Sequence, residues 1–201
     1  MVYNDDSVTI SGLMSNTTYD IYVREICTIG DSSRWVGPFQ LSTTCGVYMP
    51  NYSEDFVSFL PDCWEIANDQ SYIDGPSALG ASQWGGSTVF GGSARFNLYN
   101  TGDQDWMLSP TLDLTAGGYE LVLDVAVQAF SGGGQIDMGS DDSVTLAYTE
   151  DGIIWNELKT FGVSDSLPNT IARQSFMIPS TSSSVRFGIY ASEGIVDDAE
   201  D

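Results

Sequence analysis

The sequence predicts an all-β protein. Short segments in which apolar residues alternate with polar residues recur along the chain, and this period of two is typical of strands with one buried face. Gly, Asn, Asp and Ser separate these segments, and no segment keeps a 3.6-residue apolar period beyond a single turn. With 42% hydrophobic and 12% aromatic residues, the chain has enough apolar side chains for a sizeable core.

Most of the expected strands lie after residue 53. The clearest is 119–129, where every second residue is apolar, and the turn at Glu150-Asp151-Gly152 predicts a hairpin in which Gly152 takes a positive φ. Roughly eight to ten strands of this length suit a two-sheet antiparallel jelly-roll β-sandwich. The segments expected to form strands are 88–98, 119–129, 143–149, 155–161, 171–178 and 185–191.

A smaller group of strands is expected at the amino end. Val8 and Ile10 alternate with polar neighbours, and after a turn Tyr19, Ile21 and Val23 do the same. Two or three strands cannot bury both faces of a sandwich, so the chain is expected to begin inside a module and to be covalently part of a larger multidomain polypeptide.

Turn residues interrupt the strand pattern between residues 43 and 52. This interruption predicts a boundary between two parts of the chain. We therefore expect the carboxyl-terminal remnant of one module over residues 1–44, a linker over residues 45–52 and a second domain over residues 53–201.

The charge balance narrows the possible partners. The chain has 28 Asp and Glu against 6 Lys and Arg, a net charge of −22, which argues against nucleic acid and anionic membrane surfaces as partners. Divalent cations and neutral or cationic ligands remain possible partners. No apolar run reaches membrane-spanning length, so we expect no membrane insertion. An acidic, turn-rich all-β chain suits a secreted protein in a calcium-containing medium.

The three cysteines are interpreted as structural. The chain has no His and no Cys-x-x-Cys, so a zinc site is not expected. Cys45 closes the first part and Cys63 lies early in the second, so a disulfide between them would staple the linker, and the alternative is three buried free thiols. With that disulfide, Cys27 would pair with a residue upstream of the chain. A disulfide would place the protein outside the cytosol.

Residues 12–24 resemble the end of a fibronectin type III domain. In that family a Leu, a turn and a Tyr form a tyrosine corner before the penultimate strand, and Leu13 and Tyr19 match this pattern. Ser15 departs from it, because the family usually has Pro there. The resemblance covers residues 7–44 and implies a partial fibronectin type III sandwich.

Residues 52–201 resemble the MAM-like jelly-roll domains, and more narrowly the cleaved-adhesin or choice-of-anchor J modules of Bacteroidetes surface proteins. In that family a strand containing Ile-Asp-Asn follows an acidic loop such as 197–201, so the domain is expected to lack its last strand. The motifs that carry the resemblance are Tyr52-Ser53-Glu54-Asp55-Phe56, Leu60-Pro61-Asp62-Cys63-Trp64, Asp105-Trp106-Met107-Leu108-Ser109-Pro110, Leu112-Asp113-Leu114, and Thr149-Glu150-Asp151-Gly152 followed by Trp155.

This resemblance implies a non-catalytic adhesion or carbohydrate-binding module, secreted or displayed at the cell surface through type IX secretion, whose partner is a glycan or a surface protein. The alternative is a structural or protein-interaction repeat of a large adhesin, or an exported cargo fragment, with no glycan affinity.

The resemblance also implies a structural calcium ion. In MAM-like folds an acidic residue beside the Phe of the first strand and the Asp before the Trp help to hold the ion, which implies Asp55, Glu54 and Asp105, with Asp103 nearby. The alternative is that Asp103 and Asp105 cap a solvated turn. The acidic segments 137–142 and 197–201 lack the residue order of an EF-hand and are interpreted as solvated loops.

Aromatic residues in loop-like contexts are candidates for stacking on sugar rings, although packing in the core or at its rim is the commoner role. They are Tyr72, Trp84, Tyr99 and Phe130. By contrast, Trp64, Trp106 and Trp155 lie within the family motifs and are expected in the core.

Catalysis is not expected. Without His, and with cysteines that serve structural roles, neither a Ser-His nor a Cys-His nucleophile can be assembled. A pair of carboxylates acting on a glycosidic bond remains as the enzymatic alternative, but 28 acidic residues make such a pair uninformative.

Overall fold

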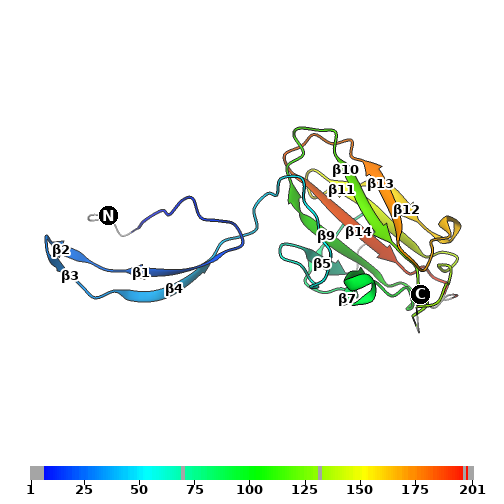
Figure 1. Cartoon of the computed structure of the whole chain (residues 1–201), viewed down its shortest axis with the longest axis horizontal. Coiled ribbons are helices and arrows are strands. Elements are labelled where there is room, and N and C mark those ends of the chain that lie inside the picture. The colour runs from blue at the N-terminus through cyan, green and yellow to red at the C-terminus, as the bar shows by residue number, and fades with distance from the viewer. Residues whose placement is uncertain (1–6, 69–70, 131–132, 197, 199–201) are drawn as a thin grey trace. The chain divides into compact units, whose positions relative to one another are not determined.

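The computed structural model describes residues 7–68, 71–130, 133–196 and 198. Strands and loops make up nearly all of it, and the only helical elements are two short 3₁₀ turns, η1 (Val89–Gly91) and η2 (Val163–Asp165), so the all-β prediction is confirmed. The chain divides into two compact units, Met1–Gly46 and Val47–Asp201. Figure 1 shows the strands of each unit.

The first unit is an antiparallel ribbon with one apolar face. It consists of β1 (Thr18–Val23) paired with β4 (Val36–Ser42), and of β2 (Ile26–Thr28) paired with β3 (Asp31–Ser32). Tyr19 lies opposite Leu41, and Ile21 lies opposite Phe39, so these four side chains share one face. The face is open, since Phe39 is 54% exposed.

The segment that precedes β1 contains a fixed turn but no strand in residues 7–10. The hydroxyl oxygen of Tyr19 accepts a hydrogen bond from the Met14 backbone N–H at 2.8 Å, which fixes the turn that precedes β1. The prediction of a strand around Val8 and Ile10 is wrong, because residues 7–10 form no ladder and both side chains are at least half exposed. Alternation alone does not make a strand where no neighbour offers backbone partners.

The second unit is built on a six-stranded antiparallel sheet in the order β12-β11-β14-β9-β5-β6. Two ribbons, β10-β13 and β7-β8, form the other layer of a sandwich. The strands are β5 (Glu65–Asn68), β6 (Ala78–Leu79), β7 (Gly85–Ser87), β8 (Ser93–Arg95), β9 (Gln104–Leu112), β10 (Glu120–Val125), β11 (Ser143–Thr149), β12 (Asn156–Phe161), β13 (Ala172–Met177) and β14 (Val185–Ser192).

All six segments expected as strands contain one. The agreement is closest at β11, whose bounds match, and at the β11-β12 hairpin, where Gly152 has the expected positive φ of 74°. It is poorest at residues 88–98, where only β8 forms and η1 occupies the start of the segment.

β9, the longest strand that the structure describes, is missing from the segments expected to form strands. Pro110 lies within it, and proline is unusual in a central strand. The structure accommodates Pro110 at a bulge, where Ser109 and Pro110 lie opposite the single residue Phe187 of β14. There the Ser109 hydroxyl accepts from the Phe187 N–H at 2.9 Å, so a side chain replaces the lost ladder contact. Arg186 also donates to the Ser109 carbonyl.

The strand β12 forms one edge of the six-stranded sheet, since among the described residues it pairs only with β11. Its ladder is interrupted at Leu158, which has no partner across β11. Next to this bulge, Lys159 is bound to Asp165 of η2 at 2.5 Å.

The two faces of the six-stranded sheet are both covered. On the inner face Met107 and Ala191 pack against Trp84 and Phe96 of the segment around the β7-β8 ribbon, and further along Val185 packs against Leu121 of β10. The outer face carries an aromatic cluster in which Trp106, fully buried, contacts Trp155, Tyr72 and Tyr190 at centroid distances of 4.7, 5.9 and 5.0 Å.

Cys45 and Cys63 form a disulfide, as one reading of the sequence expects, which excludes the alternative of three free thiols. Cys27 on β2 is an exposed free thiol. Its pairing with an upstream residue stays a prediction.

We expect Gly188→Ala to destabilise the second unit by about 1–3 kcal/mol, the usual cost of overpacking a core. A Cβ at Gly188 would lie 2.6 Å from Cζ3 of Trp155 and 2.8 Å from Cζ3 of Trp106, and neither ring can move without disturbing the outer cluster. Urea unfolding followed by tryptophan fluorescence measures the change.

Gly85→Ala is the matched control, because Gly85 also lies in a strand and has no atom within 4 Å of its added Cβ. It should leave stability within about 0.5 kcal/mol. Equal unfolding midpoints for the two variants would contradict the packing assigned to Gly188.

Candidate functional site

Asp103 and Asp105 lie together at the start of β9. The Gln83 side-chain amide donates to Asp103, and the Gln83 backbone N–H donates to Asp105. Ser82 also donates to Asp105 at 3.0 Å, and the Trp84 indole N–H donates to the Asp105 carbonyl at 3.2 Å. Asp105 is only 4% exposed. The structure therefore brings this predicted pair together and ties both members to one turn, at residues 82–84.

Glu54 and Asp55 form a separate acidic turn. The Glu54 carboxylate accepts from the backbone N–H groups of Asp55 and Phe56, both at 3.1 Å, and Asp55 accepts from the Val57 N–H at 3.0 Å. These bonds hold Phe56 at a positive φ of 54° and direct its ring against Trp64, with centroids 4.9 Å apart. Both carboxylates thus orient the chain before β5.

The four predicted calcium ligands offer the right chemistry, because carboxylate oxygen is what calcium prefers. Their arrangement, however, does not bring all four side chains together at one site. In the part of the chain that the structure describes, no three Asp, Glu, His or Cys side chains converge closely enough to hold an ion. Glu54 and Asp55 belong to one hydrogen-bond network, and Asp103 and Asp105 belong to another.

Two acidic loops that the sequence analysis treated separately lie side by side. Asp141 accepts from the N–H groups of Ile195 and Val196, and Asp142 accepts from the Gly194 N–H at 3.3 Å. Asp198 accepts from the Ser140 N–H at 3.0 Å. Of the acidic segment 197–201, residues 197 and 199–201 lie outside the described residues.

The register of the sheet explains this convergence. Ser143 at the start of β11 lies opposite Ser192 at the end of β14, so the loop before one strand meets the loop after the other. The same end of the sheet holds Asp103, whose carbonyl accepts from the Glu193 N–H. The proximity of the two loops could have been predicted only from the pairing of β11 with β14, and the alternation within single segments does not reveal that pairing.

An open pocket of about 350 Å³ lies beside these loops. Three segments line it: the loop before β11, the start of η2 and the segment that follows β14. Its lining residues are Ile136, Asp137, Met138, Gly139, Ser140, Val163 and Asp198.

The carboxyl group of Asp198 at this pocket is ionised at neutral pH. Hydrogen bonds from the Ser140 side chain and then from the Ser140 backbone N–H lower the pKa of Asp198 below its ordinary value of 3.8. Because Asp198 is fully exposed, its lowered pKa indicates that the carboxyl group lies against Ser140, and it does not indicate a large contribution to stability.

The four candidate aromatic residues fall into two groups. Trp84 is 9% exposed and packs against Phe96 at 5.4 Å, and Tyr72 is half-buried and stacks on Trp106 with an interplanar angle of 15°. Tyr99 and Phe130 are 55% and 66% exposed. Only the second group presents open ring faces.

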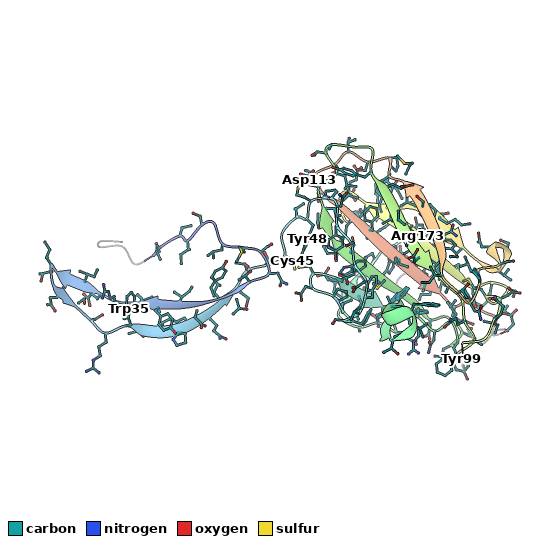
Figure 2. All side chains as sticks on the ribbon, in the orientation of Figure 1. Trp35, Cys45, Tyr48, Tyr99, Asp113 and Arg173 are labelled. Carbon is teal, nitrogen blue, oxygen red and sulfur yellow. The ribbon has the colours of Figure 1, made fainter. Side chains whose placement is uncertain are left out.

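Tyr99 lies close to the acidic loops. It precedes the turn at residues 100–103, in which the Gly102 N–H donates to the Gly194 carbonyl at 2.9 Å. Figure 2 shows Tyr99 and Asp113 at opposite ends of the second unit. One end of the sandwich therefore combines an exposed aromatic ring with several carboxylates.

A comparison with protein-family models finds no match to this chain, and a comparison with curated proteins finds no similar sequence. Among the described residues, no helix is long and apolar enough to cross a membrane.

We expect the contact between Ser140 and Asp198 to persist down to pH values below 3.8. A carboxyl group with a lowered pKa in the folded state contributes above its unfolded pKa, and the contribution is lost as the pH falls through the folded value. The Ser140 amide resonance, followed by NMR during acidification, reports that midpoint.

Ser140→Ala should move the Asp198 midpoint upward, because the Ser140 side chain is the largest cause of the shift. The pKa of Asp113, lowered by Thr115, should stay unchanged and serves as the internal control. An Asp198 midpoint unaffected by Ser140→Ala would contradict the assigned contact.

Proposed function

We propose that this chain is a non-catalytic adhesion or carbohydrate-binding module of a secreted or cell-surface bacterial protein. The observation that carries the proposal is the end of the sandwich where the loops around Tyr99, Asp141 and Asp198 converge. Loops held by a rigid sheet are where β-sandwiches place their binding residues. The same loops offer hydrogen-bond acceptors and an aromatic face, which is the chemistry that a sugar requires.

A location outside the cytosol is supported by the disulfide between Cys45 and Cys63, since such bonds persist in oxidising compartments. Type IX secretion, a fibronectin type III-like first unit and a MAM-like second unit complete the proposal. The hydrogen bond from the Met14 N–H to the Tyr19 hydroxyl supports the fibronectin type III-like assignment of the first unit, because a tyrosine corner ties its hydroxyl to the backbone upstream.

The absence of His from the sequence supports a role without catalysis. The hydroxyl groups and the exposed Cys27 thiol have no imidazole base to activate them, because the chain contains no His. Hydrogen bonds from the Ser140 side chain and backbone N–H lower the pKa of Asp198, which suits this carboxyl group poorly as a proton donor.

Structural calcium belongs to this proposal, with Asp103 and Asp105 as the first ligands and Glu54 and Asp55 as the further candidates. Asp105 favours this role because it is a nearly buried carboxylate. The ion would neutralise charge at the start of β9 and hold the turn at residues 82–84 against the sheet.

We expect calcium to raise the melting temperature of the chain relative to excess chelator. At a calcium concentration about a hundredfold above Kd, the gain is about 2.7 kcal/mol, or roughly 5–10 °C for a domain of this size. Asp105→Asn should abolish the gain, because it removes a charged ligand and keeps the shape of the side chain. Differential scanning calorimetry measures both effects.

Asp113→Asn is the control, since Asp113 lies at the far end of the unit and should leave the response to calcium unchanged. Comparing Asp55→Asn with Asp105→Asn separates the two acidic pairs. Equal melting temperatures in calcium and in chelator would rule out structural calcium.

The alternative function is a structural or protein-interaction repeat without glycan affinity. The open apolar face of the β1-β4 ribbon favours it, because exposed apolar surface marks contacts with other protein surfaces.

If the module binds carbohydrate, Tyr99→Ala should weaken binding on a glycan array by about 5- to 30-fold, as the loss of one stacked aromatic costs roughly 1–2 kcal/mol. Tyr22→Ala, at a half-exposed tyrosine of the first unit, is the matched control and should bind normally. The absence of any binding by the parent chain would select the alternative function.

A further inference from the structure

We propose that the pocket beside the acidic loops receives a Lys or Arg side chain presented by a protein partner. The pocket joins an aliphatic floor to two carboxylates, and this combination matches a cation at the end of an aliphatic stem. The inference rests on the proposed role as a binding module, and it adds the chemistry of the partner.

The floor is aliphatic. Met138 is buried, with 5% exposure, while Val163 at the start of η2 is 42% exposed and Ile136 is half-buried. Their side chains offer contact surface to methylene groups, as long basic side chains require when they cover apolar surface. The described lining residues include no aromatic side chain on which a sugar ring could stack.

The charges are placed on two different segments. Asp137 lies in the loop before β11 and is exposed, and Asp198 lies after β14. Asp198 uses one oxygen, Oδ1, to accept from Ser140, and this bond fixes the position of its carboxylate. Both carboxylates line the same pocket, so a cation that enters it is attracted by both.

Among the residues that the structure describes, no basic residue lines the pocket. Lys159 of β12 is bound to Asp165 of η2 at 2.5 Å. The Arg173 side chain is bound to Asp124, and Arg186 is bound to Glu65. Three of the six Lys and Arg side chains are thus engaged in ion pairs, and the net charge of −22 attracts basic surfaces of a partner over a long range.

A divalent metal fits this pocket less well than an organic cation does. Calcium requires about six to eight oxygen ligands, whereas the described lining residues provide two carboxylates from separate segments and the Ser140 hydroxyl, beside aliphatic side chains and Gly139. An ammonium or guanidinium group is satisfied by two carboxylates and keeps its stem against Met138 and Val163.

The test uses the whole chain, labelled with ¹³C at the methionine methyl groups and with ¹⁵N, in buffer with chelator. The probe is a capped tripeptide, acetyl-Ala-Arg-Ala-amide, and its control replaces arginine with citrulline, which has nearly the same shape and no charge. We expect saturable shifts of the Met138 methyl group and of the Gly139 and Ser140 amides with the arginine peptide. The citrulline peptide should bind at least about tenfold more weakly.

The variant Asp137→Asn/Asp198→Asn should weaken arginine-peptide binding by about tenfold or more. Asp113→Asn has the same chemistry at the other end of the unit and should bind as the parent does. Unchanged melting temperatures show that the variants are folded. If the double variant unfolds, Val163→Ser tests the stem contact and should weaken binding while the charges remain.

Spermidine distinguishes a free polyamine from a protein side chain, because it carries alkylammonium groups on methylene chains without a peptide. Spermidine affinity at least about tenfold above that of the arginine peptide would overturn the assignment to a protein partner. Equal binding of the arginine and citrulline peptides, or shifts that avoid Met138, would overturn the site itself. The calcium and glycan measurements do not depend on this result, so a failure here is distinguishable from a failure of the proposed function.

Discussion

The absence of a side chain at Gly188 is the constraint on which the second unit depends. Gly188 lies in β14, at the centre of the six-stranded sheet, and its bare backbone lets the indole rings of Trp106 and Trp155 rest directly on the strand. Tyr72 and Tyr190 close the cluster from the sides. The sheet therefore has a second buried face outside the sandwich, and its central strands are fixed from both directions.

Whether a strand is buried on one face or on both also decides whether it can be predicted from the sequence. Strands with one solvated face, such as β10 and β13, alternate in polarity and can be predicted from single segments. In β9, Trp106 and Leu108 face the outer cluster while Met107 faces the inner core, so apolar residues run continuously and the alternation disappears. Pro110 adds a further misleading signal, and only the bulge opposite Phe187 resolves it.

The candidate sites were predictable to the extent that they are local. The turn formed by Glu54 and Asp55, and the pair Asp103 and Asp105, lie close together in sequence, and each forms one network. The approach of Asp141 to Ile195 depends on the pairing of β11 with β14, which joins segments about fifty residues apart. Long-range register of this kind is set by the whole sheet, and no single segment encodes it.

The edge strand β12 has a consequence for the behaviour of the chain at high concentration. An uninterrupted edge offers a regular row of backbone donors and acceptors that a neighbouring molecule can extend into a fibril. The bulge at Leu158 breaks that row in its middle, and the charged Lys159 stands next to the break. Copies of this unit can therefore be packed densely, as in a tandem array, without edge-to-edge pairing of their sheets through β12.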